Sequence, residues 1–157
     1  LSSAVTTNNI KVALLAFALG ITFGIGTVYV LCVNGAMLGG YAGAYAQSGI
    51  ASHFWVTILP HGALELSAIA VAGGAGLLVG WSLWVPGQRT RLRALREESI
   101  RAVQLAVGLI PAFCVAGFFE GFVTPRDDIS GEIKVAAGVV AALGFWAYLL
   151  LGGRRRT

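Results

Sequence analysis

Four apolar stretches, each long enough to cross a lipid bilayer as a helix, limit what this chain can fold into. They cover residues 10–33, 59–84, 99–123 and 133–152, and about 20 helical residues are needed to cross the hydrocarbon core. Only 11% of the 157 residues are charged, whereas a soluble domain carries about 25%. The sequence therefore predicts an all-α, polytopic membrane bundle of four transmembrane helices in a single domain, and not a soluble enzyme.

Arginines are concentrated in two segments, and these predict the orientation. Five lie between residues 89 and 101 and three at 154–156, and cytoplasmic segments of membrane proteins are rich in Lys and Arg. Four spans then place both termini in the cytoplasm, at the cytoplasmic membrane. Because each basic segment flanks an apolar span, topology and anionic headgroup binding are favoured over nucleic acid. Docking of a cytoplasmic partner is the alternative for residues 89–101.

Two further features concern how the spans pack. The apolar, glycine-rich segment 35–54 is too short for another full span, so we expect a re-entrant or interfacial helix on the outer side. Small residues also recur at four-residue spacing, which lets helices approach closely in lipid. Packing within the bundle and a homodimer seam both explain this pattern, which comprises Ala16, Gly20 and Gly24, then Ala72, Gly76 and Gly80, and finally Gly117 and Gly121. Since the chain starts at Leu1 rather than Met, we expect an upstream segment.

Ionisable side chains inside the predicted spans are costly and therefore indicate function. His61 and Glu65 are four residues apart and share one helical face. Glu65 and Glu120 each lie five residues from a proline at the outer end of a span, which is about 7.5 Å of helix. Asn34 ends the first predicted span on the same side. The sequence therefore predicts that these four polar groups converge beneath the outer face.

Several functions remain open for this cluster. It could be a structural polar network, a divalent metal site for Zn²⁺ or a harder cation, a proton or solute pathway, or a hydrolase site. His61, Glu65 and Glu120 are the candidate metal ligands, with Asn34 in support. No convincing nucleophile or phosphate-binding loop is present, so no catalytic or organic cofactor-binding residue is predicted. The two cysteines, Cys32 and Cys114, are interpreted as small buried hydrophobic residues.

Several motifs resemble the stage II sporulation protein M family. They are Pro60-His61-Gly62-x-x-Glu65-Leu66 with the following Ala72–Leu77 run, Asn34-Gly35-x-x-x-Gly39, and Glu120-Gly121-Phe122-Val123-Thr124-Pro125. The resemblance runs from about Asn8 to Pro125. It implies a bacterial membrane protein whose relatives anchor peptidoglycan-remodelling complexes during engulfment in sporulation, and it implies no enzymatic activity.

The function expected from this resemblance is a membrane scaffold that recruits or positions extracytoplasmic cell-wall enzymes. The alternative is a small cation or proton transporter that uses His61, Glu65 and Glu120. Expected partners are membrane lipids, cell-wall enzymes and a second copy of the chain, with no nucleic acid.

Overall fold

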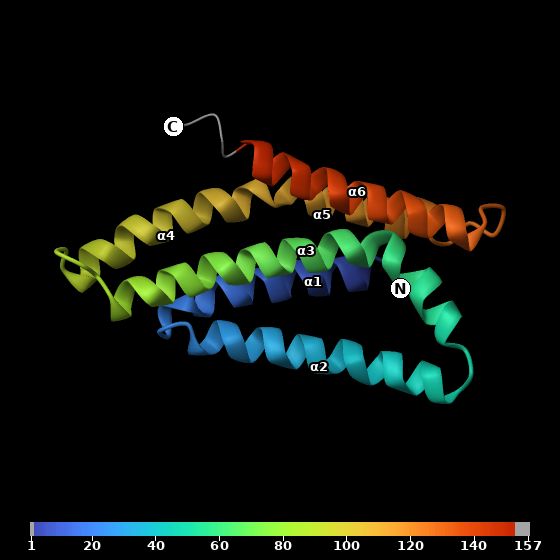
Figure 1. Ribbon diagram of the computed structural model, residues 1–157, viewed down its shortest axis with the longest axis horizontal. Coiled ribbons are helices and arrows are strands. Elements are labelled where there is room, and N and C mark those ends of the chain that lie inside the picture. Colours follow the sequence, from blue (N-terminus) through green and yellow to red (C-terminus); the bar gives the residue numbers. More distant parts are fainter. Residues whose placement is uncertain (1, 153–157) are drawn as a thin grey trace.

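The computed structural model describes residues 2–152, which form helices joined by short turns and loops, with no strands in this range (Figure 1). Four stretches are long and apolar enough to cross a membrane: Ile25–Gln47, Ala51–Trp84, Arg91–Val123 and Gly131–Leu151. The predicted polytopic, all-α membrane fold is thereby confirmed. The elements are α1 (Ser2–Ala18), the 3₁₀ turn η1 (Leu19–Ile21), α2 (Ile25–Gln47), α3 (Ala51–Trp84), α4 (Arg91–Gly108), α5 (Ile110–Phe118), the π-helical segment η2 (Phe119–Val123) and α6 (Gly131–Gly152).

Helix α3 is the axis of the bundle, because it contacts α1, α2, α4, α5 and α6. Its 34 residues extend about 50 Å at 1.5 Å per residue, which exceeds a hydrocarbon core of about 30 Å. The buried positions of α3 include many small residues, such as Ala68, Ala72, Ala75 and Gly76. Small side chains let neighbouring backbones come close in a membrane, so one helix can hold several others.

The prediction of a first span at residues 10–33 is wrong, because the chain reverses in the middle of this stretch and forms two antiparallel helices. The reversal lies at Phe23 and Gly24, whose φ angles are 58° and 82°. Glycine adopts this left-handed conformation without steric cost. The indole N–H of Trp84 donates to the carbonyl oxygen of Phe23 at 3.1 Å, which holds the strained residue in place. Helix α1 is consequently a separate and shorter apolar helix.

The expected re-entrant segment at 35–54 is also corrected, because α2 continues through it to Gln47. The chain then turns over residues 48–50, where Gly49 has a φ of 75°, and α3 begins at Ala51. A continuous helix satisfies every backbone hydrogen bond at membrane depth, and this outweighs the low helix propensity of the glycines.

The reversal at residues 22–24 changes the predicted path of the N-terminal region. The start of α1 lies towards the end of the bundle that carries the 48–50 turn, and the 85–90 loop lies at the opposite end (Figure 1). We call these the 48–50 end and the arginine end. The loop 124–130 also lies at the 48–50 end, because a Cβ on Gly131 would be 2.6 Å from the Val56 side chain. If the arginine end is cytoplasmic, α1 starts on the other side, which differs from the four-span prediction.

Two of the small-residue stripes pack against each other inside the chain. A Cβ added to Gly80 would lie 2.4 Å from the backbone nitrogen of Gly24, and one added to Gly76 would lie 2.4 Å from the carbonyl oxygen of Ala16. The hydroxyl of Thr27 donates to the same Ala16 oxygen at 2.6 Å. The stripes of η1 and α3 therefore serve packing within the bundle, and they are not free for a homodimer seam.

Candidate functional site

A buried polar cluster occupies the half of the bundle nearer the 48–50 end. Glu65 of α3 has no exposed surface, and His61 of α3 and Glu120 of η2 are each only 6% exposed. Glu120 lies within electrostatic range of both His61 and Glu65. The structure therefore brings the three candidate residues into one neighbourhood, as the sequence pattern suggested.

Pro60 fixes the turn of α3 that carries His61. The proline is completely buried, and its backbone approaches α6 so closely that a Cβ on Gly138 would be 2.4 Å from the Pro60 carbonyl oxygen. Proline inside a helix cannot donate a backbone hydrogen bond. The adjoining turn is therefore positioned by packing against α6, and His61 and Glu65 point from it on one face.

Glu120 enters the bundle from a π-helical turn. The Thr124 backbone N–H donates to the Phe119 carbonyl at 2.8 Å, five residues back. Such wide turns are rare and are often found at functional sites. On the opposite side of the same turn, the exposed rings of Phe118 and Phe122 stack at 5.2 Å. The turn thus separates one buried carboxyl group from two lipid-facing rings.

Helix α1 supplies two cluster residues that sequence reasoning missed. The Thr6 hydroxyl donates to Glu120 Oε2 and also lies beside the Glu65 carboxyl, while Asn9 Nδ2 donates to Glu65 Oε2. Thr6 therefore bridges the two acids. A signal was present, because Thr6 and Asn9 continue the spacing of the buried small residues Ala13, Ala16 and Gly20 along one helical face.

Asn34 is placed differently from the other predicted residues. It lies in the middle of α2 rather than at the end of a span, and it is half-buried. Among the described residues, its side chain makes no hydrogen bond with His61, Glu65 or Glu120. The cluster is therefore built by α1, α3 and η2.

The cluster contains two carboxyl groups that no cationic side chain of residues 2–152 pairs with. Over residues 2–152, the ion pairs join arginines to Glu97, Glu98 and Asp128 only. The one buried lysine, Lys134, donates to the Thr124 carbonyl at 2.9 Å. Isolated buried carboxylates are costly, so the cluster needs protons or a bound cation.

Three buried polar atoms near this region have no hydrogen-bond partner: His61 Nδ1, Glu65 Oε1 and Thr124 Oγ1. Buried polar groups are normally paired, so these atoms are free to contact a proton or an ion. No three His, Cys, Asp or Glu side chains of residues 2–152 are arranged to hold a metal ion among themselves. A metal here would have to use other donors, such as the Thr6 hydroxyl, and the metal site stays a prediction.

The stage II sporulation protein M family matches residues 1–125 of the chain. The chain belongs to this family. An uncharacterized protein of Methanocaldococcus jannaschii is 30% identical over 125 residues, which cover 78% of this chain and 70% of the relative. No solved structure matches.

The part matched by the stage II sporulation protein M family includes every member of the polar cluster, namely Thr6, Asn9, His61, Glu65 and Glu120. Helix α6 lies beyond the matched residues.

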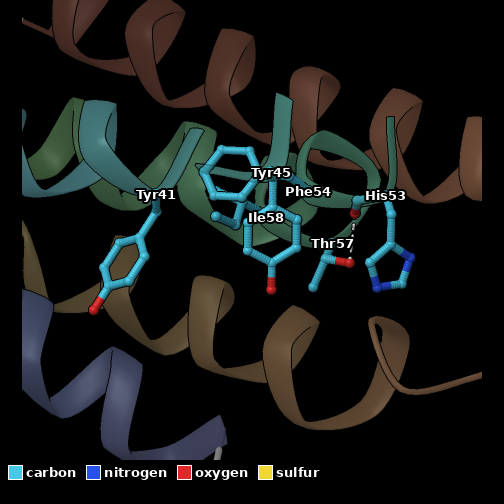
Figure 2. A pocket seen from close by; sticks show the side chains of 6 residues that line it. All are labelled: Tyr41, Tyr45, His53, Phe54, Thr57 and Ile58. Carbon is cyan, nitrogen blue, oxygen red and sulfur yellow. Dashed lines mark hydrogen bonds between the residues drawn. The ribbon is translucent and has the colours of Figure 1, made fainter. Parts of the chain in front are cut away.

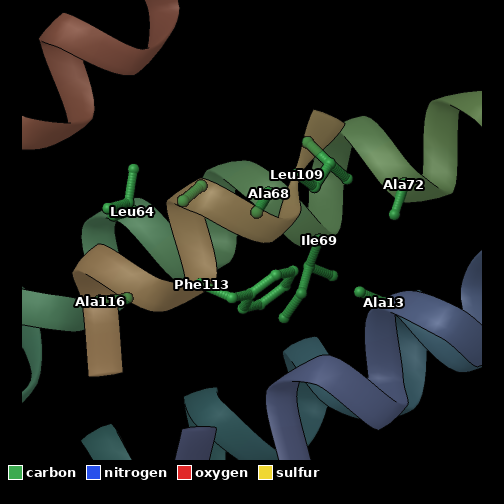
Figure 3. Close-up of a cluster of buried hydrophobic side chains, with 9 residues drawn as sticks. Ala13, Leu64, Ala68, Ile69, Ala72, Leu109, Phe113 and Ala116 are labelled. Carbon is green, nitrogen blue, oxygen red and sulfur yellow. The ribbon is translucent and has the colours of Figure 1, made fainter. Parts of the chain in front are cut away.

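An apolar layer closes the cluster off from the arginine end. Figure 3 shows this layer, in which Ala13 of α1 packs with Leu64 to Ala72 of α3, with Leu109 between α4 and α5, and with Ala112 to Ala116 of α5. A second apolar group, formed by Ala75, Val79 and Ala102, continues towards the arginine end. The buried side chains that adjoin the carboxyl groups on that side are therefore apolar.

A small pocket of about 200 Å³ lies at the 48–50 end, away from the buried acids. Figure 2 shows that it is lined by Tyr41 and Tyr45 of α2 and by His53, Phe54, Thr57 and Ile58 of α3. The Tyr45 and Phe54 rings are 5.2 Å apart, and the Thr57 hydroxyl is occupied by a 2.8 Å bond to the His53 carbonyl. The pocket is mainly an aromatic contact between two helix ends, and we assign no chemistry to it.

Proposed function

We propose that this protein is a membrane scaffold that recruits or positions extracytoplasmic peptidoglycan-remodelling enzymes through its membrane-embedded surface. Family membership supports this role, because the resemblance to stage II sporulation protein M implies an anchor rather than a catalyst. The observation that carries the proposal is the bare face of α2, which is the open helix face that carries Gly35, Gly39 and Gly43.

Helix α2 is attached to the bundle along one side only. Only 6% of its apolar window is buried, and a Cβ on Gly35, Gly39 or Gly43 would meet nothing within 4 Å. These glycines are four residues apart and lie on one face, an arrangement that lets a second transmembrane helix pack closely. Gly20 of η1 and Gly76 and Gly80 of α3 are already packed within the chain, whereas Gly35, Gly39 and Gly43 of α2 are available to a partner.

A photo-crosslinking experiment in membranes of the native host tests the scaffold. A photoreactive amino acid replaces Gly39 on the open face of α2, and the matched control replaces Leu143 of α6, which is 64% exposed but belongs to no glycine stripe. We expect a membrane-anchored cell-wall hydrolase, or its anchor subunit, to be crosslinked from position 39 and not from position 143.

The crosslinked enzyme is then purified and reconstituted with this protein in nanodiscs, where its hydrolysis of peptidoglycan is measured with and without the scaffold. Lipid adducts alone at both positions would rule out a partner on this face. If position 39 crosslinks only to a second copy of this chain, the open face of α2 is a homodimer interface and the scaffold proposal is contradicted.

A second function, cation or proton transport, is supported by the two buried carboxyl groups of the cluster, which have no cationic partner among residues 2–152. Glu65 and Glu120 are buried among neutral donors, and such groups mark ion pathways in many membrane proteins. The apolar layer next to the cluster counts against continuous conduction, so transport would require the helices to move.

Ion flux in proteoliposomes distinguishes the two functions. Transport predicts a flux of protons or sodium ions that is lost in Glu65→Gln and Glu120→Gln and kept in Glu132→Gln, where the same change is made at an exposed residue. Wild-type flux no greater than that of empty liposomes would remove the transporter from consideration and leave the scaffold unaffected.

A further inference from the structure

An apolar groove runs between α2 and α3 towards the arginine end. Its volume is about 1210 Å³, and its walls include Cys32 of α2 and Leu78 and Trp84 of α3. Gly74 forms part of the floor, where a Cβ would meet nothing within 4 Å. The groove therefore runs along the bundle surface and is open to the surrounding lipid. Because its walls are apolar, the part of a ligand that lies in it must be apolar too.

The length of the groove matches one leaflet of a bilayer. Its lining on α3 extends from Gly74 to Val85, the residue that caps the helix, and these eleven steps correspond to about 16 Å. Half of a hydrocarbon core of about 30 Å is about 15 Å. A partner helix would need the whole thickness of the membrane, whereas the acyl chain of a lipid fits one leaflet.

Positive charge gathers where the groove ends. Val85 lines the groove, and Arg89 Nε donates to the carbonyl of the next residue, Pro86, at 3.3 Å. Arg89 and Arg93 are already bonded to Glu97. Arg91 is exposed and has no ion pair in the described part of the chain, so its charge is available to an anion at the membrane surface.

We propose that this groove is a binding site for an anionic phospholipid, with an acyl chain between α2 and α3 and the phosphate headgroup at the arginines around Arg91. Basic residues next to a membrane surface attract anionic headgroups, and the apolar walls retain the chain. On α2 the groove uses residues 25–32, nearer the arginine end, whereas Gly35, Gly39 and Gly43 lie further along the helix, and the proposal does not depend on the scaffold role or on transport.

Native mass spectrometry of the purified protein tests the site, with phosphatidylglycerol and phosphatidylcholine offered in equal amounts. Phosphatidylglycerol should be retained in preference to phosphatidylcholine. Gly74→Leu fills the groove without an internal clash and should abolish retention, while Gly144→Leu, at an equally open glycine of α6, should preserve it.

A second pair of variants tests the headgroup contact without altering the groove. Arg91→Gln should lower the preference for phosphatidylglycerol about fivefold, the effect of one arginine near an anionic surface. Arg126→Gln, at the opposite end of the bundle, should leave it unchanged. The proposal would be overturned if the wild type retained the two lipids equally. It would also be overturned if Gly74→Leu unfolded at the wild-type temperature and still retained phosphatidylglycerol as the wild type does.

Discussion

The carbonyl oxygen of Gly76 in α3 lies directly against the backbone of Gly20 in η1, so that a Cβ on Gly20 would be only 2.2 Å away from it. Gly20→Ala forces α1 and α3 apart, and overpacking of this kind costs about 1–3 kcal/mol. We expect a lower midpoint for unfolding in detergent. Gly74→Ala adds the same methyl group to α3 where no neighbour lies within 4 Å, and it should leave the midpoint unchanged or raise it slightly. Equal loss in both variants would contradict the close contact.

Glu65 should tolerate a neutral replacement far better than truncation. Asn9 donates to its carboxyl group, and Glu65→Gln keeps an acceptor oxygen and the side-chain volume. Glu65→Ala leaves Asn9 without its partner and opens a cavity, at a cost of about 1–3 kcal/mol. Denaturant titration in micelles measures both variants beside Glu132→Gln. The expected order of stability is wild type, then Gln, then Ala; a glutamine variant as unstable as the alanine variant would show that the negative charge itself is required.

The metal prediction can be tested by elemental analysis of the purified protein. The candidate ligands His61, Glu65 and Glu120 predict one equivalent of a bound divalent metal, which would require their side chains to rearrange, because they do not form a three-ligand site in the described residues. His61→Ala is the control: a metal present in the wild type and missing in this variant would support the site, and a wild type without metal would rule it out.

The orientation of the bundle can be measured by labelling single cysteines in intact cells with a membrane-impermeant maleimide. Cysteines at Ser48 and Asp127 lie at the 48–50 end and should react from outside. A cysteine at Gln88, in the loop of the arginine end, should react only after permeabilisation, because arginine-rich loops stay in the cytoplasm. The background carries Cys32→Ser and Cys114→Ser, since both native thiols are exposed. The reverse pattern would invert the bundle and place the polar cluster in the cytoplasmic leaflet.

Hydropathy was sufficient to predict the fold class, because long apolar runs have few alternatives to membrane helices. It did not reveal the reversal at Phe23 and Gly24, since a left-handed turn made of apolar residues leaves no polar break in the sequence. The continuation of α2 to Gln47 was missed for the opposite reason: its glycines suggested an interruption, although lipid favours an unbroken helix.

The candidate site was predictable where it depended on helical spacing and not where it depended on tertiary contacts. His61 and Glu65 share a turn, and Glu120 lies at a matching depth on an antiparallel helix. Thr6 and Asn9 were missed because α1 was not recognised as a separate helix. Asn34 was assigned to the cluster because the first span was expected to end there, whereas it lies within α2.

The apolar layer next to Glu65 and Glu120 affects how a change at one membrane surface is transmitted to the other. On that side the two carboxyl groups adjoin apolar side chains in the described part of the bundle. A change at the carboxyl groups would therefore reach the opposite surface as a shift or tilt of α1 and α5 against the central helix.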